Sequence, residues 1–301
     1  MSFWIVTDAC CDLPAAYIKN QSDFLVVPMD YHIDGETKKI DPLDENLAEG
    51  NRAFYEKLQN GSTSTTFQVN RQDWLDALTP LCEQGRDVLV LAFSSGLSGT
   101  CATAFSAVEE LTEKYPGRAL FAVDTLCASM GEGLFTHLVM AQRAAGKTIE
   151  ECRRYALDLV PKLNQWFTVY DLHFLRRGGR VSSTSAYLGS ILKIKPILNV
   201  DPKGKLIVRG KVQGRKRSLR TLVEKVREYA FQPETQTMMI SHGDCEEDAL
   251  WVAGRFKEDL GVPEVIVSPI GPIIGSHSGP GTVAVFFLGK DGEGRLTSPK
   301  E

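Results

Sequence analysis

Residues 87–100 read DVLVLAFSSGLSGT, and this stretch decides the fold class. Its first part, 87–93, is nearly all apolar, which is typical of a central parallel strand covered on both faces. Small hydroxyl residues and glycines follow, and we expect a helix from there to about Lys114. The next strand is expected at 120–123, so strand, small-residue turn and helix alternate as in α/β proteins. Ligand sites in such folds lie at the carboxyl ends of the strands.

The rest of the chain continues this alternation. Apolar runs predict strands at 4–6, 24–33, 166–170, 238–241, 265–267 and 282–288. Apolar spacing predicts helices at 47–58, 74–81, 129–145, 148–160 and 183–193, and a basic helix from about 215. Asp34-Gly35 signals one hairpin, and the turn Asp201–Gly204 predicts another over 195–212. A boundary at Pro161 gives two expected α/β lobes, 1–161 and 162–301.

The composition excludes several classes of protein. With 43% hydrophobic and 24% charged residues the chain is globular, and a net charge of −4 argues against a general nucleic-acid binder. Its seven cysteines include no C-x-x-C pair, which indicates reduced thiols inside a cell. The N-terminus MSFWIVTD does not resemble a signal peptide, and no apolar run approaches the roughly 20 residues that span a bilayer. We therefore expect a cytoplasmic protein without a membrane span.

The turn 93–100, FSSGLSGT, is the first candidate site. It leaves backbone N–H groups accessible at the start of a helix, where the helix dipole favours an anion. The alternative is that Ser95 or Ser98 only caps the helix. The polar stretch 62–70, STSTTFQVN, could be a surface loop. If it lies at the same sheet edge as 93–100, its hydroxyl groups could instead donate to an anion held there.

The stretch 270–282, IGPIIGSHSGPGT, is rich in glycine and proline and predicts a fixed loop around His277. A histidine there is either structural or placed for function. The chain order Ser98, Asp171, His277 would suit a serine hydrolase, although the turn 96–100 does not keep the spacing of a nucleophile elbow. No histidine has metal-ligand spacing such as H-E-x-x-H, so no metal is predicted.

The segment 203–220 is strongly basic and contains no acid between Asp201 and Glu224. Such a run is usually a solvated face. It could instead dock an acidic partner or a phosphate, whereas nucleic acid is disfavoured because aromatic residues are scarce. There is also no G-x-x-x-x-G-K-[ST] phosphate loop and no complete dinucleotide fingerprint.

Eight segments, taken in order, resemble the DegV family, the fatty-acid-binding subunits of bacterial fatty acid kinase. These segments are IVTDACCDLP, TTFQVN, SSGLSGT, VDTLCASMGEG, DLHFLRRGGRVS, ILKIKPIL, KVQGRKR and IGSHSGPGT. The resemblance implies a two-lobed α/β fold: a mainly parallel sheet flanked by helices in the first lobe, a mixed sheet in the second, and a lipid tunnel between or within them. It also implies a carrier with no catalytic residue, cofactor or metal.

The resemblance further implies what each matching residue does. Thr66 and Ser98, with Ser95 next, would hold the carboxylate of one long-chain fatty acid such as palmitate, stearate or oleate, and His277 would lie nearby. A protonated His277 would add positive charge during phosphorylation. Arg180 and Arg215 match basic positions implicated in docking a separate ATP-binding kinase subunit or in lying near the phosphate. Transient membrane contact is left open, and nucleic acid is not an implied partner.

Two residues depart from the family's pattern. Phe67 replaces the usual serine of a TSQPS-like loop and could narrow the pocket, and Gln213 stands where arginine is common and removes one charge from the proposed dock.

Overall fold

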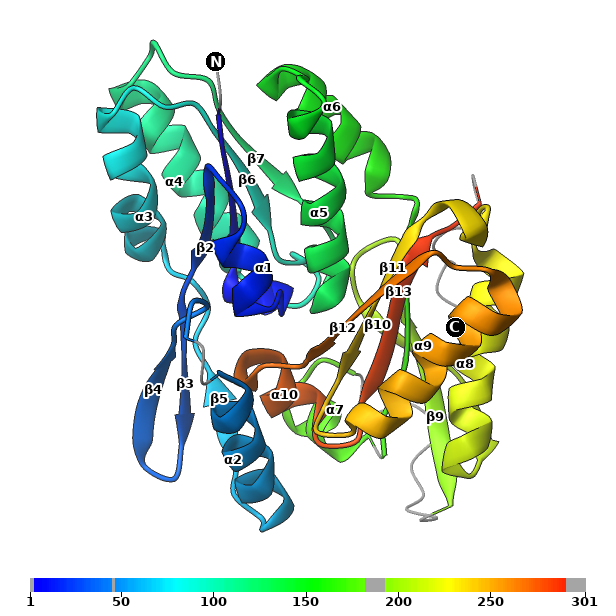
Figure 1. The fold of residues 1–301 in the computed structure, drawn as a ribbon. Coiled ribbons are helices and arrows are strands. Elements are labelled where there is room, and N and C mark those ends of the chain that lie inside the picture. Colours follow the sequence, from blue (N-terminus) through cyan, green and yellow to red (C-terminus); the bar gives the residue numbers. More distant parts are fainter. Residues whose placement is uncertain (1–2, 45–46, 171, 182–192, 291–301) are drawn as a thin grey trace.

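The computed structural model describes residues 3–44, 47–170, 172–181 and 193–290. Within these residues the strands form three sheets, and helices cover both large sheets (Figure 1). The α/β fold class predicted from 87–100 is confirmed.

The first sheet is parallel and has the strand order β2-β1-β6-β7. Its strands are β1 (Trp4–Asp8), β2 (Phe24–Val27), β6 (Val88–Ala92) and β7 (Leu120–Asp124). Strand β6 pairs with β1 and β7 and is buried along its whole length, so the apolar run 87–93 does form a central strand. Helices α3 (Arg71–Glu83) and α4 (Thr100–Lys114) pack on one face, and α5 (Met130–Ala144) and α6 (Ile149–Leu159) on the other (Figure 1).

The second sheet is mixed and has the order β10-β9-β8-β13-β11-β12. Its strands are β8 (Leu163–Thr168), β9 (Ile194–Val200), β10 (Leu206–Gln213), β11 (Thr237–His242), β12 (Glu264–Pro269) and β13 (Val283–Leu288). The expected hairpin over 195–212 is present, since β9 and β10 pair antiparallel. Helices α8 (Arg215–Tyr229) and α9 (Glu246–Leu260) cover one face, while α5 contacts the other, so α5 lies between the two large sheets.

The third sheet has three strands, β4 (Glu36–Ile40), β3 (Met29–Ile33) and β5 (Ser64–Thr66), and α2 (Leu47–Gln59) lies near it. Strands β3 and β4 pair antiparallel on either side of Asp34-Gly35, so the hairpin predicted there is confirmed, whereas the addition of β5 was not predicted. The run 24–33 was expected as one extended segment, but it divides at Pro28 into β2 and β3, which belong to different sheets. Short helices complete the chain: α1 (Ala15–Lys19), α7 (His173–Arg177), α10 (Pro272–Ser278) and the 3-10 turns at Ala9–Cys11 and Pro233–Thr235.

Helix α10 corrects a prediction, because we expected a loop around His277. Pro272 is the first helical residue, where its fixed φ favours a helix and its missing N–H costs nothing. Gly279, with φ of 77°, ends the helix. The helix predicted at 183–193 falls almost wholly on 182–192, outside the described residues.

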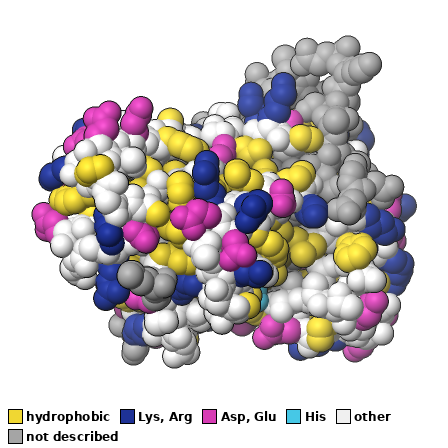
Figure 2. Space-filling view, turned by 90° about the horizontal axis from the view of Figure 1, so that it is seen from above, with side chains coloured by type: hydrophobic (Ala, Val, Ile, Leu, Met, Phe, Trp, Pro, Cys, Tyr) yellow, Lys and Arg dark blue, Asp and Glu magenta, His cyan; other side chains and the backbone are white. Residues whose placement is uncertain are grey.

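The boundary at Pro161 stays a prediction. The strands of the first and third sheets precede residue 125 and those of the second sheet follow residue 162. Helix α10, however, contacts β3, β5 and α2 from the first half of the chain. Over the face shown in Figure 2, acidic, basic and hydrophobic side chains are interspersed.

Candidate functional site

A cavity of about 360 Å³ lies between segments from both halves of the chain. This volume is within the range of small-ligand pockets. Most of its wall is apolar, and the side chains come from β3, β8, β9, β10, β13, α7, α10 and the intervening turns. The apolar lining consists of Cys10, Met29, Phe67, Phe93, Leu97, Ala128, Phe167, Leu175, Val200, Leu206, Ile270, Ile273, Ile274, Ala284 and Phe286. A mainly apolar molecule therefore fits it better than a polar one.

At one end of the cavity, four polar side chains converge: Thr66, Ser98, Arg180 and His277. We call this set the polar end. Thr66 Oγ1 lies 2.8 Å from His277 Nε2, although the two residues are 211 positions apart in the chain. Thr66 is the last residue of β5 and pairs with Tyr31, while His277 is in the last turn of α10. The contact between α10 and the small sheet therefore creates this pair.

His277 is neutral near pH 7. Burial, and then the positive charges of Arg180 and Arg177, lower the pKa of His277 to about 4. This pKa disfavours the hypothesis that a protonated His277 adds charge, and the positive charge in this part of the cavity wall is that of Arg180. His277 Nδ1 is buried and has no hydrogen-bond partner among the described residues.

Ser98 lies at the start of α4 and lines the cavity. Its Oγ accepts a hydrogen bond from Thr100 N at 3.2 Å and lies 3.0 Å from Thr100 Oγ1. If Thr100 Oγ1 also donates to it, Ser98 keeps its own proton for a ligand in the cavity. Ser95, in contrast, is exposed, is not part of the cavity wall, and donates its N–H to Asp124 Oδ1.

The two polar segments predicted from the sequence do meet. Val69 N donates to Thr100 Oγ1, and Thr103 Oγ1 donates to Val69 O at 2.6 Å. Gly99 lies close to Gln68, since a Cβ at position 99 would lie 2.3 Å from Gln68 Oε1. Parts of both segments, 66–68 and 97–99, thus line the cavity together.

The two arginines singled out from the sequence lie in different places. Arg180 lines the cavity, and its Nε donates to Leu97 O at 3.3 Å. A second bond joins Arg180 Nη1 to Gly178 O. Its guanidinium is therefore held in the cavity wall near His277, a position compatible with a place near the transferred phosphate.

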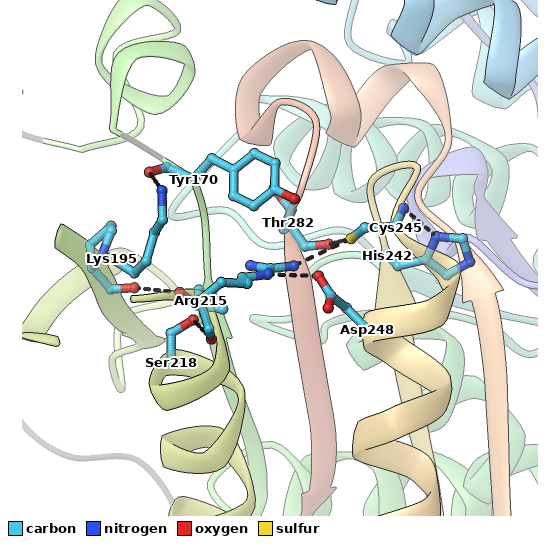
Figure 3. Close-up of polar contacts among 10 residues, drawn as sticks. Tyr170, Lys195, Arg215, Ser218, His242, Cys245, Asp248 and Thr282 are labelled. Atoms are coloured by element: carbon cyan, nitrogen blue, oxygen red, sulfur yellow. Dashed lines mark hydrogen bonds and ion pairs between the residues drawn. The ribbon is translucent and has the colours of Figure 1, made fainter. Parts of the chain in front are cut away.

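Arg215 lies outside the cavity wall, at the first position of α8 (Figure 3). Its Nε contacts Asp248 Oδ2 at 2.7 Å, and its guanidinium lies over the Tyr170 ring, 4.8 Å from the centroid. Lys195 Nζ lies over the same ring at 4.9 Å. Tyr170 is exposed, so this basic cluster is accessible from solvent, although Arg215 itself already has an acidic partner.

The polar end is more exposed than the opposite end. Phe67, Gln68 and Gly99 line the cavity near Thr66 and are exposed, Phe67 by 51%. Gln165 and Phe286 at the other end are exposed by only 2% and 3%. A ligand whose polar group lies beside Thr66 would therefore present that group near the surface.

Several lining residues were missed by sequence reasoning: Cys10, Met29, Ser129, Gln165 and Thr282. Cys10, Ser129 and Thr282 lie in segments that resemble the family's, but nothing in those segments singles these residues out. Met29 and Gln165 lie in no such segment, and a strand residue facing a cavity has the same pattern as one facing a core. Cys10 Sγ lies 3.4 Å from Met29 Sδ, and burial raises the pKa of Cys10 well above its ordinary value. Cys10 is therefore a protonated wall residue.

The start of α10 is fixed by Asp12, on the turn after β1. Asp12 Oδ1 accepts a hydrogen bond from Gly271 N at 2.9 Å, and Oδ2 accepts one from Ser129 Oγ at 2.5 Å. Ser129 Oγ also lies 2.8 Å from Ser241 Oγ. This network joins the first sheet, α5 and α10, and so it helps to place His277.

A hydrolase triad does not form among the described residues. His277 Nε2 pairs with Thr66 and no hydrogen bond joins His277 to Ser98 there, while Asp171 lies outside the described residues. The same residues include no group of three or more His, Cys, Asp or Glu placed to hold a metal ion. No helix within them is both long and apolar enough to cross a bilayer.

Comparison with known proteins identifies relatives along almost the whole chain. A DegV domain-containing protein of Clostridium perfringens is 41% identical over 287 residues, which is 95% of this chain and 97% of that protein. A Thermotoga maritima protein, whose structure revealed a fatty-acid-binding function, is 28% identical with a TM-score of 0.80, covering 96% of this chain and 99% of that one.

A third relative is similar in fold alone. The fatty acid kinase B3 protein of Streptococcus pneumoniae, solved with linoleic acid, has a TM-score of 0.83 at 17% identity and covers 96% of this chain and all of that one. The pattern of the DegV family, described as uncharacterised proteins, matches residues 2–290. With that match and the 41% identical relative, the resemblance read from the eight segments is confirmed: the chain belongs to the DegV family.

Proposed function

We propose that this chain is a non-catalytic carrier that binds one long-chain fatty acid in the cavity with its carboxylate at the polar end. One observation carries the proposal: a mostly apolar cavity ends at two hydroxyls and one guanidinium, those of Thr66, Ser98 and Arg180. The fatty-acid-binding function of the Thermotoga maritima relative supports it. Palmitate, stearate and oleate are the candidate ligands, and no cofactor is proposed.

The energetics favour such a ligand. Burying an acyl chain gains about 0.8 kcal/mol per methylene, so a sixteen-carbon chain gains on the order of 10 kcal/mol before the cost of ordering it. A buried carboxylate without partners would cancel much of this gain. Hydroxyl donors from Thr66 and Ser98 and the charge of Arg180 offset that cost. His277, neutral and bonded to Thr66, would orient the threonine hydroxyl.

We further propose that the carboxylate is presented to a separate ATP-dependent kinase subunit, which forms the acyl phosphate, in the cytoplasm. The exposure around Phe67, Gln68 and Gly99 supports access from outside at the polar end. Arg180 lines the same cavity, and its proposed role is to contact the carboxylate and then the transferred phosphate. The cluster of Tyr170, Lys195 and Arg215 is the proposed surface for an acidic part of the kinase (Figure 3).

Mass spectrometry of an organic extract from the purified protein tests the carrier proposal. We expect a near-stoichiometric C14–C18 fatty acid in the wild type and its depletion in a Thr66→Ala/Ser98→Ala double variant. A wild type that is empty and takes up no added fatty acid would remove the proposal. A Ser95→Ala variant is the matched control and should retain the lipid, because Ser95 is exposed and lies outside the cavity wall.

A serine esterase using Ser98 and His277 remains a distinct alternative that the geometry does not favour. A fluorophosphonate probe distinguishes the two functions, because an esterase would be labelled at Ser98. We expect the wild type to stay unlabelled.

A further inference from the structure

We infer that Gln165 sets the maximum length of the acyl chain, as the polar member of the end wall opposite Thr66 and His277. This wall, which we call the buried end, consists of Gln165, Phe286, Val200 and Leu206. The inference rests on the proposed function, because it concerns the same cavity and its ligand.

The strand register places these residues at one end. Phe286 of β13 pairs with Gln165 of β8, and Val200 of β9 pairs with Leu206 of β10. Because β13, β8, β9 and β10 are consecutive in the sheet, the four side chains cross the cavity side by side.

The same register gives the direction of the cavity. Thr282, Ala284 and Phe286 alternate along the chain, and all three line it. Thr282 follows α10, which carries His277, so the line from Thr282 to Phe286 runs from the polar end to the buried end. At about 3.4 Å per residue, these four steps span roughly 14 Å. A chain anchored at Thr66 therefore points its methyl group toward Gln165.

Gln165 is held rigidly at this position. Its Oε1 accepts a hydrogen bond from Ala128 N at 3.0 Å, and its Nε2 donates one to Leu126 O at 3.1 Å. Behind it lies Gly131, where a Cβ would be 2.6 Å from Gln165 Oε1 and 2.8 Å from Phe286 Cδ1. The Phe286 ring and the Gln165 amide already pack against the backbone of α5, so neither can move back to make room for a longer acyl chain.

A purely structural role for Gln165, holding the turn before α5, predicts a different outcome from a role in chain length. Gln165→Met keeps the length of the side chain and removes its hydrogen bonds. Gln165→Ala removes the same bonds and also shortens the side chain. The two variants should therefore share any loss of stability, and only the alanine variant should accept longer chains.

The experiment measures the affinities of saturated fatty acids from C10 to C20 by displacement of a fluorescent fatty acid. In the wild type and Gln165→Met we expect affinity to rise by roughly fourfold per added methylene, from about 0.8 kcal/mol each, and then to stop at the same length. In Gln165→Ala the rise should continue for two or three further carbons. Ala128→Leu adds bulk to the wall beside Gln165, so in this variant the affinity should stop rising at a shorter chain length than in the wild type.

The inference is overturned if Gln165→Ala and Gln165→Met stop at the same length. If the alanine variant does not fold, Ala128→Leu decides the question, and an unchanged limit there equally overturns the inference. A wild type that binds no fatty acid of any length contradicts the proposed function itself, so the two failures are distinguishable.

Discussion

Replacing Thr66 with valine removes one hydroxyl from the polar end and keeps the β-branched shape of the side chain. If Thr66 donates a hydrogen bond to a fatty-acid carboxylate, the lost bond to a charged group should cost about 1.5–3 kcal/mol, or roughly 10- to 140-fold in affinity. The loss should be the same for every chain length, because the methyl end is not changed. Displacement of a fluorescent fatty acid measures it directly.

Thr65→Val is the matched control. Thr65 is exposed and precedes Thr66 on β5, so its side chain points to the opposite face of the strand. The affinity of the Thr65→Val variant for fatty acid should stay within about twofold of the wild type, because Thr65 is not expected to contact the ligand. The methyl ester of the same fatty acid gives a second check, because Thr66→Val should affect its binding much less than that of the acid. Equal effects of both substitutions, or equal effects on acid and ester, would refute the assignment of Thr66.

Three further outcomes follow from the structure. Arg180→Met should weaken binding of the acid at least tenfold, from a lost charged hydrogen bond of about 1.5 kcal/mol or more, and leave the methyl ester nearly unchanged in the same assay. Burial raises the pKa of Asp12 to about 7, so folding takes up a proton between pH 4 and 7. The unfolding free energy should therefore fall with rising pH in this window by up to about 1.4 kcal/mol per unit, and urea titrations should show a shallower fall in Asp12→Asn. Asn70→Ala removes the capping box of α3 and should cost about 1 kcal/mol of unfolding free energy in urea, with no change in ligand affinity.

Local patterns were sufficient for most of the fold. The run 87–93 could be identified as a central strand because a strand buried on both faces has no polar alternation. The hairpin over 195–212 followed from the turn residues Asp201–Gly204, where Gly204 adopts a φ of 73°. The division of 24–33 at Pro28 was missed, although 24–27 is wholly apolar, 29–33 alternates apolar and polar residues, and Pro28 stands between them. Helix α10 was missed because seven residues are too few to show helical periodicity.

The candidate site was predictable only in part. Thr66, Ser98 and His277 stand in unusual polar or glycine-rich segments, and these segments do meet at one end of the cavity. The contact between Thr66 and His277 depends on how α10 packs on the small sheet, which no local pattern encodes. The resemblance grouped Arg180 with Arg215, whereas the guanidinium of Arg180 lies in the cavity wall and Arg215 lies outside it.

The two ends of the cavity contribute differently to binding of the proposed ligand. One hydroxyl worth about 1.5–3 kcal/mol equals the burial of roughly two to four methylenes at about 0.8 kcal/mol each. A sixteen-carbon chain therefore owes most of its affinity to the apolar wall, and the polar end mainly decides which way the chain lies. If the chain were reversed, its carboxylate would meet Gln165, whose amide is already bonded to Leu126 and Ala128, with no cation beside it among the described wall residues. In the proposed complex, the cost of stranding that charge would keep the carboxylate beside Arg180, at the more exposed end of the cavity.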